Sequence, residues 1–483
     1  HLRLADRMIG LRVKSLKGVP ASEFHWQPQP KAQAFINELV ADFLARCPAA
    51  ADLARRMTHD TATRFNDWID YIQVPKSDKI RARLTSVGFT RNPFPGAPDC
   101  YIHEGALFPS IMLDRSPVTR LAIKVDSVVD FLTAHHITDD LAIDGEPLGR
   151  LRRAPAFFGE KAELWAVERH GYRGFSAPDV DPDIAMKTLQ HSEAFRRRTR
   201  DWDEDEIGLD HTDQLIDAAV ADLGPDLACD LFFYAERAYW QSRNHAGRIQ
   251  KARQDKLGLG WANHDHHTYR SSRHCFTRLV RMFEKLGFNL RERFYAGQEA
   301  GWGAQVFEHP VTGIVIFADV DLSPEEIQGD FSHDPLPQRE SLGTVGLWCG
   351  LHGEAILQAG MHHLECQFDH ASLRAQLEVA SIKTMDPFTN FAYLRQAFTE
   401  GERWTVNPAR IQKLVEKNLI TPAQSHWFRM QGGAIGSHLE NLERNDGYKG
   451  FNQQGVSHII AKTDPRKQPA KPAPQHPDAL VGA

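Results

Sequence analysis

The stretch that most constrains the fold is residues 263–270, NHDHHTYR, in which three histidines, an aspartate and an arginine fall within eight residues. Alternate side chains of an extended strand share one face. One face of the predicted strand carries His264, His266, Thr268 and Arg270, and the other carries Asp265, His267 and Tyr269. Neighbouring histidines therefore point to opposite faces. We expect the strand to supply one ligand to a metal site whose other ligands come from distant parts of the chain.

The residues after this strand predict a module of one strand, one helix and three strands. A helix is expected at residues 272–286, where apolar residues recur at helical spacing between a Ser272 cap and Gly287. Strands are expected at residues 289–295, 303–308 and 314–319, the last after a Thr312-Gly313 turn. The order is βαβββ.

A second module of this kind is expected to open at residues 361–368, MHHLECQF, where His363 and Glu365 share a face. A helix at residues 370–377 follows, and a later strand at 437–444, SHLENLER, has His438 and Glu440 on one face. One histidine from each opening strand and one carboxylate from the closing strand would form a facial triad. Such a triad leaves coordination positions open, as non-haem Fe(II) needs when it binds substrate and O₂ together. A structural zinc more often closes its fourth position with a protein ligand.

The N-terminal half repeats the strand and helix pattern. Strands are expected at 68–74, 106–113, 120–125 and 162–168, and helices at 76–87 and 127–135. We predict an α+β protein of paired βαβββ modules that form a cupped sheet, with added helices. The expected division is a helical segment at 1–60, a degenerate metal-free half at 61–180, a helical insertion or linker at 181–255, a metal-binding half at 256–463 and a disordered tail at 464–483. The charged run at 196–206, RRRTRDWDEDE, predicts a solvated surface.

Composition excludes several classes of function. A net charge of −6 provides no general attraction for nucleic acid or an anionic membrane. No apolar run reaches the roughly 18 residues of a membrane helix. The six cysteines form no CxxC pair, which argues against a disulfide framework and is typical of a reducing cytoplasm. We expect a cytoplasmic protein without nucleic-acid or membrane partners, and the sequence is compatible with an oligomer.

Residues 265–270, DHHTYR, resemble the D-H-x-x-F/Y-R motif of the 2-oxoadipate dioxygenase/decarboxylase family, also called 2-hydroxyglutarate synthases. This family is a distant branch of the vicinal-oxygen-chelate superfamily. His363 is similar to the family's second histidine, with His362 as the alternative, and residues 438–444 are similar to the segment that carries its glutamate, here Glu440. The resemblance covers about residues 256–463. It departs where Met-His-His replaces Asn before the second histidine, and the N-terminal half has no counterpart in the family.

The resemblance implies Fe(II) bound by His266, His363 and Glu440, with Zn, Ni or Mn as other divalent metals for such a set. It implies that a 2-oxo acid similar to 2-oxoadipate reacts with O₂ and is oxidatively decarboxylated to a hydroxy acid. His264 and His267 are then expected outside the ligand set.

Arg270 suits this chemistry because its planar fork can bind a substrate carboxylate. It lies four residues beyond His266 on the same strand face, about 13 Å away at the usual rise. Asn452 and Gln453, in the loop after the Glu440 strand, are expected to line the substrate pocket. Two other functions remain open from the sequence. One is a lyase or isomerase of glyoxalase type that uses the metal as a Lewis acid, and the other is a non-catalytic small-molecule binding protein.

Overall fold

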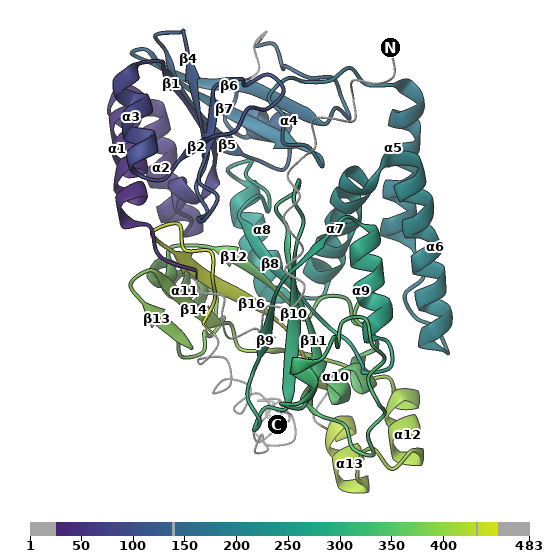
Figure 1. Ribbon diagram of the computed structural model, residues 1–483. Helices are drawn as coiled ribbons and strands as arrows, with labels where there is room; N and C mark the ends of the chain where they lie inside the picture. The colour runs from purple at the N-terminus through teal and green to yellow at the C-terminus, as the bar shows by residue number, and fades with distance from the viewer. Residues whose placement is uncertain (1–25, 138–140, 431–432, 453–483) are drawn as a thin grey trace, which may run out of the picture.

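Two curved sheets, one from each half of the chain, form the frame of the protein (Figure 1). The computed structural model describes residues 26–137, 141–430 and 433–452. The seven-stranded sheet has the order β2-β3-β4-β1-β5-β7-β6. The nine-stranded sheet has the order β13-β14-β16-β12-β8-β11-β10-β9, and β15 pairs with β16. The expected tail at 464–483 and the first 25 residues lie outside the described residues.

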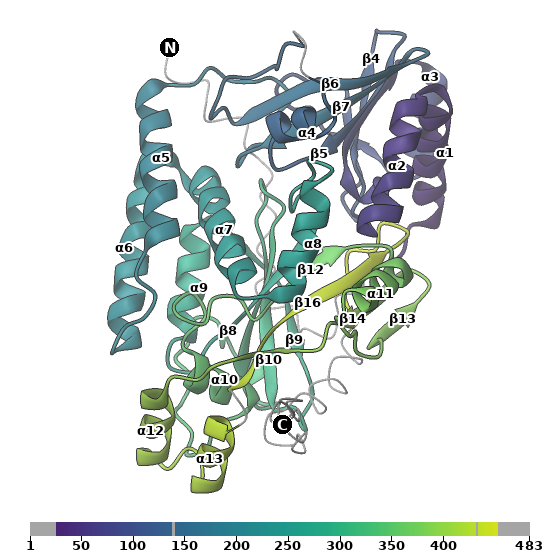
Figure 2. The same cartoon turned by 180° about the vertical axis from the view of Figure 1, so that it is seen from behind.

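The N-terminal half consists of two helices followed by two strand and helix units. Its elements are α1 (Pro30–Arg46), α2 (Pro48–Thr61), η3 (Phe65–Trp68), β1 (Ile69–Pro75), α3 (Asp78–Ser86), β2 (Thr90–Arg91), β3 (Cys100–Ile102), β4 (Ser110–Asp114), β5 (Thr119–Lys124), α4 (Val128–Ala134), β6 (Leu151–Gly159) and β7 (Ala162–Arg169). Helices α1, α2 and α3 lie beside this sheet in both views (Figures 1 and 2).

Four helices connect the two sheets: α5 (Pro182–Arg197), α6 (Asp205–Leu223), α7 (Pro225–Ser242) and α8 (His245–Asp255). The C-terminal half then contains β8 (His264–Arg270), α9 (Phe276–Lys285), β9 (Asn289–Tyr295), β10 (Trp302–Glu308), β11 (Val315–Asp321), η4 (Glu326–Gln328), α10 (Thr344–His352), β12 (His363–Gln367), α11 (His370–Val379), β13 (Thr389–Phe391), β14 (Leu394–Phe398), β15 (Glu402–Trp404), α12 (Pro408–Glu416), α13 (Pro422–Met430) and β16 (Ala434–Arg444). Within the described residues, no helix is long and apolar enough to cross a bilayer.

The two sheets share one topology, in which the first strands of paired modules lie antiparallel at the centre. Strand β1 pairs antiparallel with β5 and parallel with β4, and β5 pairs parallel with β7. Strand β8 likewise pairs antiparallel with β12 and parallel with β11, and β12 pairs parallel with β16. The predicted fold class is therefore confirmed: the chain is an α+β protein of paired modules that form two curved sheets, with added helices, the arrangement of the vicinal-oxygen-chelate fold. Within the described residues, the module that begins with β5 differs from the predicted βαβββ order, because two strands, β6 and β7, follow its helix.

A bulge recurs at the same place in both sheets. The register of β1 on β5 shifts between Ile69 and Tyr71. The register of β8 on β12 shifts between Leu364 and Cys366, where two residues of β8 lie opposite one residue of β12. An extra residue in one strand interrupts the strict alternation of side chains, so the next residue faces a different side of the sheet than alternation predicts. The strand that begins each half is thus bent at the same position.

An arginine at the end of the closing strand also recurs. In the N-terminal half Arg169 Nε donates to Asp70 Oδ2 (2.9 Å), and its Nη1 donates to the carbonyl of Gly174 (2.7 Å). In the C-terminal half Arg444 Nη2 donates to Asp265 Oδ2 (2.9 Å), and its Nη1 donates to the carbonyl of Gly450 (2.6 Å). Each arginine fixes the bulged strand and the loop that follows its own strand.

The helices of the two first modules end in the same way. Gly88 follows α3 and Gly287 follows α9, and both have φ of 94°, which a residue with a side chain rarely adopts. A Cβ at Gly88 would lie 2.7 Å from the ring of His103, and one at Gly287 would lie 2.8 Å from the ring of His309. Together with the bulge and the arginine, this end shows that the two halves are built on one repeated plan.

Direct hydrogen bonds join the two halves. Arg64 Nη2 donates to the carbonyl of Arg444 (2.6 Å), and the backbone N–H of Asp369 donates to the carbonyl of Ala62 (2.8 Å). Gln250 Nε2, from helix α8, donates to the carbonyl of Thr61 (2.7 Å). The end of helix α2 is therefore tied to the C-terminal sheet.

The sequence located the opening strands well and missed several later elements. The strand predicted at 263–270 is β8, and the helix predicted at 272–286 is the shorter α9, whose buried face includes Phe276, Leu279, Val280 and Phe283. Helices α10, α12 and α13 and strands β13 to β15 were not predicted. The charged run at 196–206 was wrongly predicted as entirely solvated: Arg198 and Arg200 are buried and pair with the buried Glu236.

Candidate metal centre

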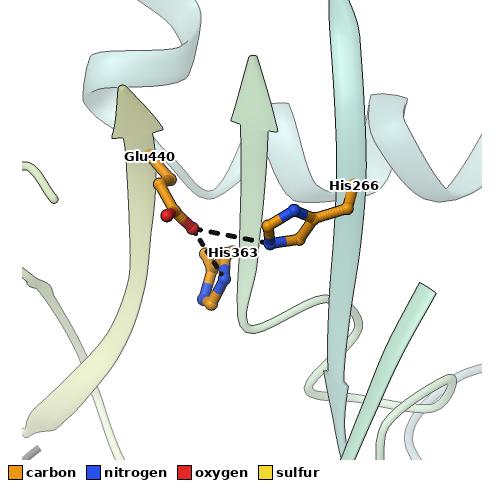
Figure 3. Close-up of side chains that lie close together, drawn as sticks. All are labelled: His266, His363 and Glu440. Carbon is orange, nitrogen blue, oxygen red and sulfur yellow. Dashed lines mark ion pairs between the residues drawn. The ribbon is translucent and has the colours of Figure 1, made fainter. Parts of the chain in front are cut away.

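Three neighbouring strands bring the predicted ligands together. Figure 3 shows His266 from β8, His363 from β12 and Glu440 from β16 converging on one point. Glu440 Oε2 lies 3.2 Å from His363 Nε2 and 3.6 Å from His266 Nε2. One donor atom from each residue lies within 4.8 Å of the others, and all three side chains are buried. The convergence follows from the strand order β16-β12-β8, because residues far apart in sequence here become neighbours across the sheet.

A carboxylate orients His266. Its Nδ1 lies 2.6 Å from Glu365 Oε1 and 3.5 Å from Asp265 Oδ2, so its Nε2 is the atom that faces Glu440. Metal-binding histidines usually hold their second ring nitrogen against a carboxylate in this way. Burial lowers the pKa of His266, but Glu365 and Asp265 outweigh burial and raise the pKa to about 9. The site therefore attracts positive charge strongly.

Carboxylates surround His266 and make the site electrostatically suited to a cation. Burial and the neighbouring Glu365 raise the pKa of Glu440 well above its ordinary value. Burial also opposes ionisation of Asp265, but Arg444 and His266 hold its pKa well below the ordinary value. Gln396 Nε2 donates to Glu365 Oε2 (2.8 Å) and Glu440 Oε1 (3.2 Å) and so links the two glutamates. A divalent cation can replace the protons on His266 and Glu440, since ligands must be deprotonated to bind metal.

His363, rather than His362, faces the other two donors. His363 Nε2 lies 2.8 Å from Thr268 Oγ1, and its Nδ1 is buried without a hydrogen-bond partner in the described part of the chain. Burial and the nearby His266 hold the pKa of His363 well below the ordinary value, so the ring is neutral, as a metal ligand requires. His362 Nδ1 instead bonds the carbonyl of Gly436 (3.0 Å), and its ring lies against Trp348. The donor set of two neutral histidines and a carboxylate suits a divalent transition metal.

The bulge in β8 changes the expected facing of Asp265. Strict alternation predicted that Asp265 points away from His266, and this prediction was wrong. The register shift opposite Glu365 places both residues on one face, so Asp265 lies beside His266 and pairs with Arg444. His264 is displaced with it, and its ring packs on that of His267 (5.2 Å between centroids).

The remaining predicted side chains, His267, Tyr269 and His438, have contacts outside the group of candidate ligands. His267 packs on Phe233, and Tyr269 donates to Glu236 Oε2 (3.2 Å). His438, on the same strand as Glu440, places Nδ1 3.0 Å from the carbonyl of Thr399. Burial lowers the pKa of His438 to about 4 and keeps it neutral. None of these three residues joins the group that His266, His363 and Glu440 define.

Arg270 is a buried cation on the strand that carries His266. Its Nε lies 3.8 Å from Asp319 Oδ2, and its guanidinium lies 5.7 Å from the centroid of the Trp348 ring. Within the described residues, Arg270 Nε has no hydrogen-bond partner. Burial raises the pKa of Asp319 to about 7, although Arg270 opposes the rise. Arg270 therefore lacks a fully ionised close partner at neutral pH.

Aromatic rings cover the outer side of His266. Phe317 from β11 packs on His266 with 4.6 Å between ring centroids, and Phe451 packs on Phe317 at 4.8 Å. Phe451 also contacts Phe294. Asn452 follows Phe451 and is half-buried, whereas Gln453 lies outside the described residues. The rings exclude water from one side of the candidate site.

Sequence reasoning missed three residues of the site: Glu365, Gln396 and Arg444. Glu365 shares a face with His363, and this was the one available signal for it. Gln396 comes from β14, a strand that was not predicted. Arg444 lies at the end of the predicted Glu440 strand, but its partner Asp265 is 179 residues away in sequence, and no local pattern connects the two.

Comparisons with known proteins add structural likeness only. No protein-family model and no curated protein matches the chain. Among solved structures, a variant of 4-hydroxymandelate synthase from Streptomyces coelicolor is similar at 10% identity and a TM-score of 0.28, covering 70% of this chain and 96% of that one. Methylmalonyl-CoA epimerase from Mycobacterium tuberculosis is similar at 12% identity and a TM-score of 0.22, covering 38% and 88%. An uncharacterized protein from Shigella flexneri is similar at 10% identity and a TM-score of 0.24, covering 59% and 83%. We base the function on the site, because likeness at this level says nothing of chemistry.

Proposed function

We propose that the protein is a non-haem Fe(II)-dependent dioxygenase that oxidatively decarboxylates a 2-oxo acid similar to 2-oxoadipate to a hydroxy acid. The observation that carries the proposal is the convergence of His266, His363 and Glu440 from three adjacent strands. In the described part of the chain this group has three members, the number that leaves room for substrate and O₂ on one metal.

Side chains around the triad fit the proposed reaction. Bound Fe(II) would supply the redox chemistry with O₂ and polarise the 2-oxo group. Glu365 holds the ring of His266 with Nε2 toward Glu440. Phe317 and Phe451 exclude water from one side, which strengthens electrostatic interactions inside the site.

Arg270 is the candidate anchor for the substrate's second carboxylate. It is buried on the same strand as His266, and its nearest carboxylate, Asp319, has a pKa of about 7. A substrate carboxylate would supply the ionised partner that Asp319 supplies only in part at neutral pH. Asn452 adjoins Phe451 and remains a candidate for substrate contact, as does Gln453.

The proposed reaction has a definite stoichiometry. One 2-oxo acid and one O₂ give one CO₂ and one hydroxy acid that is shorter by one carbon. The substrate provides its own 2-oxo group, so no second oxo acid is consumed. For 2-oxoadipate the product would be 2-hydroxyglutarate.

Oxygen consumption tests the proposal. Metal-free protein is loaded with Fe(II) under anaerobic conditions and mixed with 2-oxoadipate in air-saturated buffer, and O₂ and CO₂ are measured together. We expect equal amounts of O₂ consumed and CO₂ released. Turnover without O₂ in the presence of Zn²⁺ or Ni²⁺ would instead identify a lyase or isomerase. Absence of turnover, together with no metal-dependent rise in melting temperature, would identify a binding protein.

Metal analysis of variants tests the site itself. We expect wild-type protein to hold one metal per chain, and His266→Ala and Glu440→Ala to lose more than about 100-fold in metal affinity, beyond the loss seen when only an orienting residue is removed. His333→Ala is the matched control, because His333 is an exposed histidine that pairs with Asp330 and Glu284 at the surface. Full metal content in both ligand variants would show that the site is wrong.

A further inference from the structure

The N-terminal sheet holds a cavity of about 500 Å³ that the proposed reaction does not use. It is lined by residues of β1, β4, β5, β6 and β7, among them Tyr71, Gln73, Arg120, Arg153 and Trp165, and by Phe175 from the segment after β7. The volume is in the range of small-molecule sites. We call the face of the seven-stranded sheet that lines this cavity the N-terminal cup, and the face of the nine-stranded sheet that carries His266, His363 and Glu440 the C-terminal cup.

The repeated plan aligns this cavity with the metal centre. Gln73 pairs with Arg120 across β1 and β5, as Thr268 pairs with His363 across β8 and β12. Tyr71 lies two residues before Gln73 on β1, and His266 lies two residues before Thr268 on β8. Tyr71 and His266 therefore occupy equivalent positions. Ala122 of β5 pairs with Trp165 of β7, as Glu365 of β12 pairs with Glu440 of β16. The positions of the three metal ligands are therefore taken by Tyr71, Arg120 and Trp165.

The charge of this cup is opposite to that of the metal centre. Four cations line the cavity, Lys76, Arg115, Arg120 and Arg153, against two carboxylates, Asp99 and Asp114. Lys76 and Arg91 both bond Asp99, and Asp114 Oδ1 accepts from the backbone N–H of Ser116. Arg120 and Arg153 also have carboxylate partners, Glu163 and Asp144. With Arg115 as a further cation, the residues that line the cavity still include more cations than carboxylates.

Arg120 presents unused donors to the cavity. Its Nε donates to Glu163 Oε2 (2.8 Å), and its terminal nitrogens make no hydrogen bond to any described residue. Arg153 Nε donates to Asp144 Oδ2 (2.8 Å). Both guanidinium groups lie over the Trp165 ring, at 5.3 and 5.8 Å from its centroid. The tryptophan holds the two cations at one wall of the cup.

Gln73 provides an independent sign of a missing partner. The side chain is 8% exposed, and its Nε2 is buried without a hydrogen-bond partner in the described part of the chain. Buried donors are normally satisfied, so an unpaired one that lines a cavity calls for an acceptor from outside the chain. Tyr71 and Phe175 pack edge to face beside it and add an apolar surface.

We propose that the N-terminal cup is a metal-independent binding site for a small organic carboxylate with a flat or apolar body. The carboxylate accepts hydrogen bonds from Arg120 and Gln73, and its body packs against Tyr71, Trp165 and Phe175. This inference does not depend on the proposed function, because no residue of the C-terminal cup takes part.

Calorimetric titration of the full-length metal-free protein tests this site, with benzoate, glutarate and inorganic phosphate as probes. We expect benzoate to bind at one site per chain, and to bind equally well to Arg270→Gln, which removes the anchor of the other cup. Arg120→Gln and Gln73→Met should each weaken binding about 10-fold or more, since each loses a hydrogen bond to a charged group. Arg83→Gln, which alters an exposed pair with Glu38 outside the cup, should bind as wild type does.

The unliganded stability of Gln73→Met separates binding from a structural role. Methionine has a similar shape and removes an unpaired donor, so we expect its melting temperature to equal or exceed that of wild type. Loss of folding in Gln73→Met would assign the glutamine to the core and overturn its role in binding. Binding of phosphate without either carboxylate, loss of binding in Arg270→Gln, unchanged binding in Arg120→Gln, or no heat with any probe at millimolar concentration would each overturn the site.

Discussion

The N-terminal and C-terminal cups share the same strand pairing, but the side chains that line them differ in charge. In each, a bulge bends the first strand, and an arginine from the closing strand, Arg169 or Arg444, holds the aspartate at that bulge. The residues that face the cup differ at every position of the triad. The frame is set by backbone pairing and by groups at the edge of the cup, so the chemistry inside can change without altering the fold.

The difference in contents is chiefly one of charge. The C-terminal cup gathers Asp265, Glu365 and Glu440 around two histidines, which suits a cation. The N-terminal cup gathers arginines over Trp165, which suits an anion. Glu365, which orients His266, corresponds to Ala122, so the N-terminal cup also lacks the group that would orient a ligand there.

Removing the repeated arginines should have the largest effect. Arg444→Met leaves Asp265 buried without its partner, and we expect a loss of about 3–5 kcal/mol in the free energy of unfolding of the metal-free protein. Arg169→Met should cost about 1.5–3 kcal/mol, because Arg169 and Asp70 are more exposed and water replaces part of the interaction. Urea denaturation of both variants measures the two values. An equal or greater loss in Arg169→Met would contradict the comparison.

The carboxylate beside His266 should affect metal binding and leave the fold intact. Glu365→Gln keeps the shape and the bond from Gln396 but weakens the hold on His266 Nδ1, and we expect metal affinity to fall about 10- to 100-fold. Competition with a chromogenic chelator measures the affinity. Glu163→Gln, which alters the partner of Arg120 in the other cup, is the control and should bind metal as wild type does. A loss of affinity in the control would mean that the two cups are coupled.

The sequence selected the three side chains that converge in the structure, and two of them obey the rules of a regular strand. His363 and Glu440 lie on regular stretches of β12 and β16, where alternation holds and the register pairs Glu365 with Glu440. Alternation predicted the wrong face for Asp265 because a bulge adds one residue to β8. No local sequence pattern indicated the bulge. Alternation still identified the face of His266 correctly, because His266 and Thr268, two residues apart, both face His363.

The buried ion pairs of Arg198 and Arg200 could not be predicted from the sequence, for a different reason. Arg198 and Arg200 belong to a charged run, which usually marks a solvated surface. Both are buried because Glu236, on helix α7, lies across from them and binds both at 2.5–2.6 Å. Their burial depends on how α5 and α7 pack, and packing of helices that are distant in sequence does not appear in any short window.

Two histidines, one in each half, should make stability depend on pH. Burial lowers the pKa of His170, but Asp230 and Glu168 raise it to about 10, and His266 has a pKa of about 9. The unfolded value is about 6.5, so the stabilisation from each protonated ring is complete below about pH 6.5 and is lost as pH rises through the folded pKa. We expect the metal-free protein to lose about 2 kcal/mol from His266 between pH 7 and pH 9, and about 1 kcal/mol from the partly exposed His170.

Metal separates the two contributions. A bound cation displaces the proton from His266, so metal-loaded protein should lose the part of the pH dependence that comes from His266 and retain the part that comes from His170. Urea denaturation at pH 7 and pH 9, with and without metal, measures both, and His170→Gln should remove the part that metal does not change. A metal-loaded protein with the same pH dependence as the metal-free protein would mean that His266 is not a ligand.

Helix caps in equivalent positions should have the smallest effect and should report on how the halves unfold. Ser127 Oγ caps α4 by accepting from the N–H of Asp130, and Asp369 caps α11 by accepting from the N–H of Ser372. Ser127→Ala and Asp369→Ala should each reduce the free energy of unfolding by about 1 kcal/mol. Because Arg64 and the backbone N–H of Asp369 join the halves, we expect one transition in thermal unfolding, shifted alike by both variants. Two transitions, each shifted by only one variant, would show instead that the two halves unfold independently and that the contacts between them do not couple their stability.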